Sequence, residues 1–176
     1  MVQRISTGTF TGKSIIYVFA CCLKEAARTN RDVVLLICEL FRQISSTHHR
    51  ELNRELGSFI EAGPYKGLSP LHIILHSLIS AAYIDNNTTI VEAITSIIQA
   101  ICQSEKLSSI QALFGIPITD GLNKGKTGRD LLEIARDKSS FSKIPTGALD
   151  VLIGMSAPLA HCDDSPKDSI LAFSKC

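Results

Sequence analysis

The sequence predicts an all-α fold built from about three similar helical units, and two periodic features support this prediction. The first is a glycine, one further residue, a hydroxyl side chain and then an apolar helical run. It occurs at Gly12, Gly67 and Gly125. The second is an amphipathic helical pattern of six apolar positions. Its central copy consists of Ile90, Val91, Ile94, Ile97, Ile98 and Ile101. The same spacing recurs earlier, from Val33, and later, from Ala148. Because both landmarks recur at nearly the same interval, we expect helical units that stack on one another.

The chain is expected to form one helical-repeat domain over residues 1–176, a length that suits a single full core. We place the units at about residues 10–62, 65–120 and 123–162, followed by a polar tail at 163–176. The third unit lacks the third helix of the other two. Turn residues and apolar spacing place the expected helices at 14–27, 33–44, 48–62, 69–83, 88–102, 106–114, 127–137 and 147–155.

Several helix boundaries are predicted from single residues. Asp32 is expected to cap the helix from Val33, and Ser45-Ser46-Thr47 to end it. The following helix is expected to end at Gly63-Pro64 and to turn Phe59 and Ile60 inward. Ser69 is expected to cap the next helix, with Pro70 in its first turn. Thr88 or Thr89 is expected to cap the helix after that.

Composition argues against several classes of function. Apolar residues make up 45% of the chain and the net charge is +1, so the sequence shows no basic surface for nucleic acid. The longest apolar runs, 15–23 and 33–38, are too short to span a membrane. Six cysteines lie mostly within apolar helical patterns and form no Cys-x-x-Cys pair. We therefore expect free thiols, no disulfide framework, and a reducing cytoplasmic compartment.

The segment Gly67-Leu-Ser-Pro-Leu-His72 resembles the glycine-x-threonine-proline-leucine-histidine opening of an ankyrin repeat. Residues 110–117 and 125–135 resemble the end of one such repeat and the start of a final one. The resemblance covers roughly a third of the chain, and the units are longer than the family's period of about 33 residues. In the first copy, Ser14-Ile15-Ile16-Tyr17, the proline and histidine are missing.

The resemblance implies a solenoid with short hairpin turns between the units, at 63–67 and 116–125. It also implies that the His72 ring bonds to turn backbone and ties neighbouring units together. Three helices per unit would equally suit an armadillo- or HEAT-like array, so the geometry of the unit junctions is the feature that separates the two families.

Candidate chemical sites are weak in this sequence. Gly8-Thr-Phe-Thr-Gly-Lys-Ser14 has one residue too few between its glycines for a phosphate-binding loop. His72 and His76 could face one metal ion, but the sequence offers no third and fourth ligand beside them. Cys21 and Cys22 have no basic partner nearby in the sequence that would activate a thiol. We therefore expect no catalytic site, no cofactor and no metal.

The expected function is a non-catalytic protein–protein interaction module that binds a protein or peptide. Alternatives are an armadillo/HEAT-like structural adaptor and an enzyme with a dispersed site built from His72, His76 and a cysteine. Long, isoleucine-rich repeats also resemble those of effectors that intracellular bacteria deliver into host cells. That resemblance suggests virulence and non-classical secretion. The partner-binding residues are expected at the unit junctions and on the first helix of unit two: Tyr65, Lys66, His76, Ser77, Asp120, Asn123 and Lys124.

Overall fold

The protein is all-α, which confirms the predicted fold class. The computed structural model describes residues 4–5, 13–84, 87–103, 106–142 and 144–157. Within these residues the helices are α1 (Ile15–Ala26), α2 (Arg31–Gly57), α3 (Pro70–Ala82), α4 (Thr88–Gln103), α5 (Leu107–Phe114), α6 (Gly128–Phe141) and α7 (Gly147–Ser156). None of the helices in this part of the chain has the length and apolar character needed to cross a membrane.

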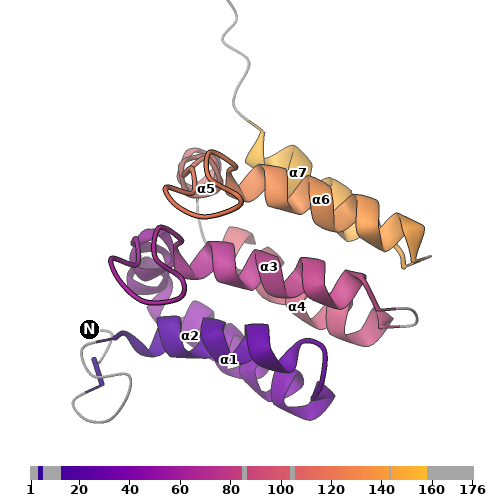
Figure 1. Ribbon diagram of the computed structural model, residues 1–176, viewed down its shortest axis with the longest axis horizontal. Helices are drawn as coiled ribbons and strands as arrows, with labels where there is room; N and C mark the ends of the chain where they lie inside the picture. The colour runs from indigo at the N-terminus through magenta and orange to yellow at the C-terminus, as the bar shows by residue number, and fades with distance from the viewer. Residues whose placement is uncertain (1–3, 6–12, 85–86, 104–105, 143, 158–176) are drawn as a thin grey trace, which may run out of the picture.

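The helices form three pairs that lie on one another as layers (Figure 1). The pairs are α1 with α2, α3 with α4, and α6 with α7. The first helices of the pairs contact one another in the order α1, α3, α6, and the second helices in the order α2, α4, α7. Their buried side chains make one core that runs through all three layers. The short helix α5 packs chiefly against α7 and also touches α2 and α6.

The recurring glycine-x-hydroxyl feature marks the start of the first helix in each pair. Ser14 Oγ accepts the N–H of Tyr17 at 3.2 Å, and Ser69 Oγ accepts the N–H of His72 at 3.5 Å, with Pro70 in the first turn. Thr127 caps α6 in the same way. Each hydroxyl satisfies a first-turn amide that has no partner within its helix, so the repeated feature is a repeated N-cap.

The boundaries predicted for the first unit need correction. Asn30, and not Asp32, caps α2: its side-chain oxygen accepts the N–H of Val33 at 3.1 Å. The break predicted at Ser45-Ser46-Thr47 lies one residue later, at His48. The Ser46 and Thr47 hydroxyls both donate to the Gln43 carbonyl, at 2.8 and 2.9 Å, so these residues still belong to the first part of α2. Hydroxyls that bond back to their own helix weaken it slightly and often bend it, which agrees with a kink directly after Thr47.

At His48 φ is −138° and ψ is 41°, so α2 is kinked there, and its second helical stretch continues to Gly57. The prediction that this helix reaches 62 is therefore wrong. Ile60 is buried as predicted, but Phe59 is 45% exposed. Both residues lie beyond the end of α2, in the segment that leads to the next unit, so helical spacing does not decide which of them faces the core.

Smaller differences occur in the other units. The helix α4 begins at Thr88, so Asn87 and neither threonine occupies the cap position. The helix α6 continues past the end predicted at 137 to Phe141, and Ser139 within it is fully buried. The recurring amphipathic pattern also predicts residues that are buried between the units. Of these, Leu40 is only half-buried. The others are buried: Ile37, Phe41, Ile94, Ile97, Ile98, Leu149 and Leu152.

Candidate functional site

Two loops of the same conformation lie at the starts of α3 and α6. In the loop 60–68, the Ile60 N–H donates to the Leu68 carbonyl at 2.8 Å, and the Gly67 N–H donates to the Ile60 carbonyl at 2.9 Å. The loop 118–126 makes the same two bonds between its equivalent residues, at 2.8 and 2.9 Å. Each loop is thus a closed hairpin, and both lie where the ankyrin resemblance implies hairpin turns.

The two loops are joined to each other. The Thr119 N–H donates to the Gly67 carbonyl at 3.0 Å. This contact needs glycine, because Gly67 has φ +80° and a Cβ placed there would lie 2.6 Å from the Asp120 nitrogen. Lys66 forms an ion pair with Asp120 at 3.5 Å across the same junction, although both side chains are more than half exposed. The backbone bond therefore fixes the loops, and the exposed ion pair adds little.

His72 makes a second connection beneath the loops. Its Nδ1 accepts the N–H of Ser69 at 3.0 Å, which leaves the ring proton on Nε2. Nε2 donates to the Ile116 carbonyl at 3.0 Å, in the segment that leads into the second loop. Both ring nitrogens of this fully buried histidine are thus in use. The structural role that the ankyrin resemblance implies for His72 agrees with this geometry.

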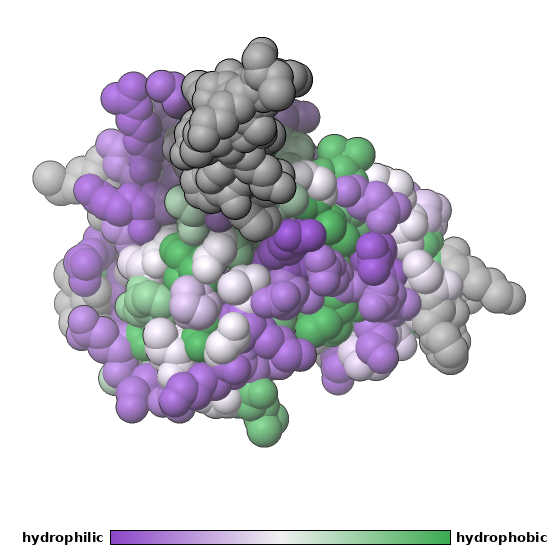
Figure 2. Space-filling view, turned by 90° about the horizontal axis from the view of Figure 1, so that it is seen from above, coloured by the Kyte–Doolittle hydropathy of each residue, from purple (hydrophilic) through white to green (hydrophobic). Residues whose placement is uncertain are grey.

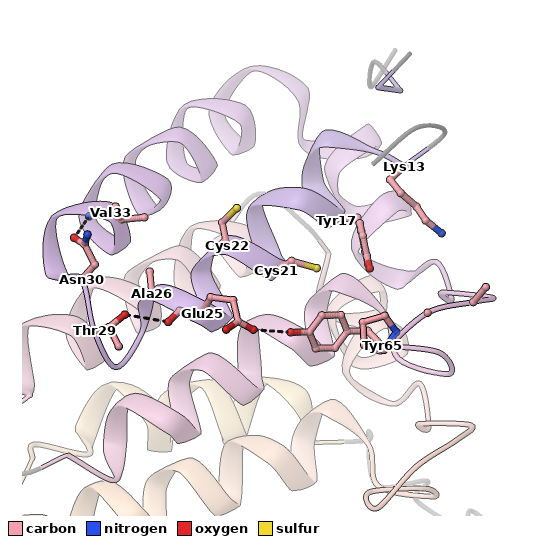
Figure 3. Close-up of a pocket in the computed structure, with 13 residues that line it drawn as sticks. Lys13, Tyr17, Cys21, Cys22, Glu25, Ala26, Thr29, Asn30, Val33 and Tyr65 are labelled. Atoms are coloured by element: carbon pink, nitrogen blue, oxygen red, sulfur yellow. Dashed lines mark hydrogen bonds between the residues drawn. The ribbon is translucent and has the colours of Figure 1, made fainter. Parts of the chain in front are cut away.

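A groove of about 790 Å³ runs along α1, beside the tip of the first loop. Its lining is mostly apolar and comes from three parts of the chain: α1, the start of α2 and residues 62–65 (Figure 3). The side chains that shape it include Tyr17, Cys21, Cys22, Ala26, Val33 and Tyr65. The Tyr65 hydroxyl donates to Glu25 Oε1 at 3.1 Å, and this bond holds the loop tip against α1 (Figure 3).

The groove keeps its phenols and its buried thiol protonated at neutral pH. Burial, followed by the hydrogen bond to Glu25, raises the pKa of Tyr65 to about 12. Burial also raises the pKa of Tyr17 to about 12 and raises the pKa of the Cys21 thiol. Lys13 lies at one end of the groove, with Nζ 5.5 Å from the centre of the Tyr17 ring. The surface offers apolar area and hydroxyl groups, with charge at its rim.

Next to the groove, α1 and α3 share a polar patch. Lys24 Nζ donates to Ser80 Oγ at 2.6 Å and to the His76 carbonyl at 3.3 Å. His76 Nε2 lies 3.4 Å from Asn123 Nδ2 in the second loop. Burial, with the charge of Lys24 next in weight, lowers the pKa of His76 to about 4, so its ring is neutral at pH 7. His76 therefore acts here as a neutral hydrogen-bonding group between a helix and a loop.

The structure brings most of the predicted partner-binding residues to this side of the molecule. Lys66, Asp120 and Lys124 are exposed on the loops, and Tyr65 lines the groove. Ser77 does not belong with them. It is fully buried, and its hydroxyl donates to the Ile73 carbonyl at 2.8 Å, so it is not available to a partner.

Sequence reasoning missed the contribution of α1 to the site. Tyr17, Cys21 and Glu25 lie at the groove, yet none was among the predicted residues. A usable signal was present. When the first two units are aligned on Gly12 and Gly67, Cys21 corresponds to His76, which was predicted. That alignment would have drawn attention to the same face of α1.

The other residues that were considered as chemical sites have mainly structural roles in the part of the chain that the structure describes. No three His, Cys, Asp or Glu side chains in this part of the chain gather as a metal site would require. The Ser14 hydroxyl caps α1, while residues 8–12 of the candidate phosphate loop lie outside the described residues. Cys21, Cys38 and Cys102 are buried free thiols and Cys22 is an exposed one; Cys162 and Cys176 lie outside the described residues.

The groove and the joined loops together form the candidate site. Its apolar floor comes from α1, and its outer wall from a loop whose backbone is fixed by hydrogen bonds. Such a surface suits a ligand that presents an apolar side chain together with hydrogen-bonding groups. Comparison of the chain with models of known protein families, with characterised proteins and with solved structures found no match.

Proposed function

We propose that this protein is a non-catalytic protein-interaction module that binds a protein or peptide segment along α1 and the two joined loops. The observation that carries the proposal is the groove of about 790 Å³, mostly apolar in lining, beside loops that are closed by their own backbone bonds. A surface that is ordered before binding loses little conformational freedom when a ligand docks, which favours affinity.

The form of the unit junctions supports an ankyrin-like array over an armadillo- or HEAT-like one. Each of the two loops closes as a hairpin, and the Thr119 N–H joins one to the other. His72 also connects the start of its helix to the next junction. The extra helix α5 is the feature that keeps a structural adaptor of the armadillo type as the second candidate.

The chemistry of the His and Cys side chains gives less support to an enzyme. Both nitrogens of His72 are held in hydrogen bonds, and burial raises the pKa of the Cys21 thiol, which disfavours the reactive thiolate. Binding is therefore the function we propose. Host-cell proteins are the partners to test first, given the resemblance of the repeats to those of bacterial effectors.

The test is a pull-down with the double variant Tyr65→Ala and Lys124→Glu. Tyr65 supplies an amphipathic ring to the groove, and Lys124 an exposed charge on the second loop. We expect loss of the partner with little change in melting temperature. The matched control is Tyr83→Ala, because Tyr83 is an exposed tyrosine at the opposite end of α3. Undiminished binding by the double variant, or equal loss in the control, would place the interface elsewhere.

A further inference from the structure

The first unit exposes apolar positions that are covered in the second unit. Aligning α1 with α3, so that Gly12 falls on Gly67, pairs Val18 with Ile73 and Cys22 with Ser77. Ile73 and Ser77 are fully buried, whereas Val18 is only half-buried and Cys22 is exposed. Because α3 is packed against α1, its equivalent side chains have a neighbour on this side. Nothing in the described residues takes that place beside α1.

The second helices show the same difference. Aligning the apolar patterns of α2 and α4 pairs Val33 with Ile90 and Leu40 with Ile97. Val33 is 36% exposed and Leu40 is half-buried, whereas Ile90 and Ile97 are 6% and 1% exposed beneath α2. We call the uncovered surface the N-terminal end face. Its residues are Ile15, Val18, Phe19, Cys22, Val33 and Leu40.

The opposite end of the stack is built differently. When Gly67 is aligned with Gly125, three fully buried leucines of α3 fall on charged residues of α6. Leu71, Leu75 and Leu78 are replaced by Arg129, Glu133 and Arg136. Arg129 and Glu133 form an ion pair at 3.3 Å. Arg136 pairs with Asp137 at 2.9 Å and lies 4.0 Å from Asp150 of α7.

Polar side chains accordingly cover much of the end that is seen from above in Figure 2, where the third unit lies. Terminal units of repeat arrays need a polar outer face to remain soluble. The third unit has one, whereas the first unit has the apolar face of an internal unit.

We propose that the N-terminal end face is an interface between two copies of this chain. The charged outer face of the third unit makes a poor cover, because burying its ion pairs against an apolar surface would carry a desolvation penalty. The cover that fits is a second apolar end face. Two copies therefore meet head to head about a two-fold axis, which closes the assembly at a dimer and prevents growth into a filament.

Cys22 and Val33 line the groove as well as the end face, so the dimer would border the groove. The dimer does not depend on the identity of the ligand. It follows from side chains of the first unit that are exposed where the equivalent side chains of the second unit are covered.

The test is sedimentation velocity on the full chain over a range of concentrations, with two matched variants. Val33→Asp places a carboxylate in the end face, at a partly exposed site near a helix N-terminus that tolerates acidic residues. Val151→Asp is the control, because Val151 is 57% exposed on α7 in the third unit. We expect the wild type and Val151→Asp to reach twice the chain mass of 19.1 kDa. Val33→Asp should dimerise at least about tenfold more weakly, because its charge would be buried.

A second measurement uses the natural thiol. Cys22 is the exposed cysteine of the described residues, so its alkylation rate, followed by mass spectrometry, should fall as the wild-type concentration rises. In Val33→Asp the rate should not depend on concentration. A wild type that stays monomeric and alkylates at one rate would overturn the proposal. So would a dimer that resists Val33→Asp, or species that keep growing beyond two copies.

Discussion

His72 Nε2 lies 3.0 Å from the carbonyl oxygen of Ile116, so one buried imidazole connects the start of α3 to the segment that leads into the next loop. Replacing His72 with alanine removes this bond and the bond from the Ser69 N–H, and leaves both backbone groups without their partners. We expect a loss of about 2–4 kcal/mol in the free energy of unfolding. Thermal melting followed by circular dichroism would measure it.

The same experiment separates the structural role of His72 from a metal role. A structural histidine gives the same melting temperature with added zinc and with a chelator, in the wild type and in the variant. Stoichiometric zinc binding that disappears in His72→Ala would contradict the structural role.

A pair of glycines allows the contact between the loops to be measured by itself. Gly67 and Gly125 occupy the same loop position and have φ of +80° and +86°. A Cβ at Gly125 would meet open space, whereas one at Gly67 would lie 2.5 Å from the Asp120 Cβ. We expect Gly125→Ala to cost about 1–2 kcal/mol for its backbone conformation alone. Gly67→Ala should cost more.

Hydrogen exchange at the Thr119 amide provides a local check, because this N–H donates to the Gly67 carbonyl. Its protection should fall in Gly67→Ala and remain in Gly125→Ala. Equal stability and equal protection in the two variants would mean that the loops do not depend on each other.

Stability should fall in mild acid because of His76. Burial lowers the pKa of this ring in the folded chain from 6.5 to about 4, and in the unfolded chain it returns to the ordinary value. Below pH 6.5 the unfolded chain therefore binds a proton that the folded chain does not, so stability is lost as the pH falls. Between pH 7 and pH 5 we expect a loss of about 2 kcal/mol from this group.

Urea unfolding at the two pH values would measure this loss, and His76→Gln should remove most of the difference. Burial lowers the pKa of His72 as well, so part of the acid sensitivity should remain in the variant. A His76→Gln protein with the full wild-type pH dependence would show that this ring is not the source.

The packing between the layers predicts a large effect at Ile97, which is 1% exposed on α4. Ile97→Ala should cost about 2–5 kcal/mol, because it removes a buried side chain and leaves a cavity. Val151→Ala is the control on α7, since Val151 is 57% exposed, and surface truncations of this kind usually cost about 0.5 kcal/mol or less. Comparable urea midpoints for the two variants would argue against the layered core.

The sequence predicted the helices well wherever a start signal was local. Ser69 and Thr127 lie directly before the helices that they cap, and each works through an amide in the first turn of its own helix. The helix boundaries that were missed depend on residues that fit two alternative local structures almost equally well. Asn30 and Asp32 are both good caps, and Ser46 and Thr47 can either end a helix or bond back to it.

The site was harder to predict because it joins residues that are distant in the sequence. Tyr65 of the first loop meets Glu25 of α1, and Lys24 of α1 meets Ser80 of α3. Helical periodicity shows which face of a helix is apolar but not which neighbour covers it. Ser77 illustrates the limit: its place after the loop suggested a contact surface, and the packing of α3 buries it fully.

The hydrogen bonds that close the two loops join main-chain atoms, so the backbone conformation of the loops does not depend on which side chains their tips carry. The bonds run between main-chain atoms of residues 60, 67 and 68, and of residues 118, 125 and 126. The side chains at the tips, Tyr65 with Lys66 and Asn123 with Lys124, take no part in them. Replacing these four residues should therefore leave the backbone of each loop closed while altering what the loops bind. Of the four, Tyr65 also holds its loop tip against α1 through Glu25. Their positions are natural sites for laboratory diversification, in which a new binding specificity could be selected on an unchanged scaffold.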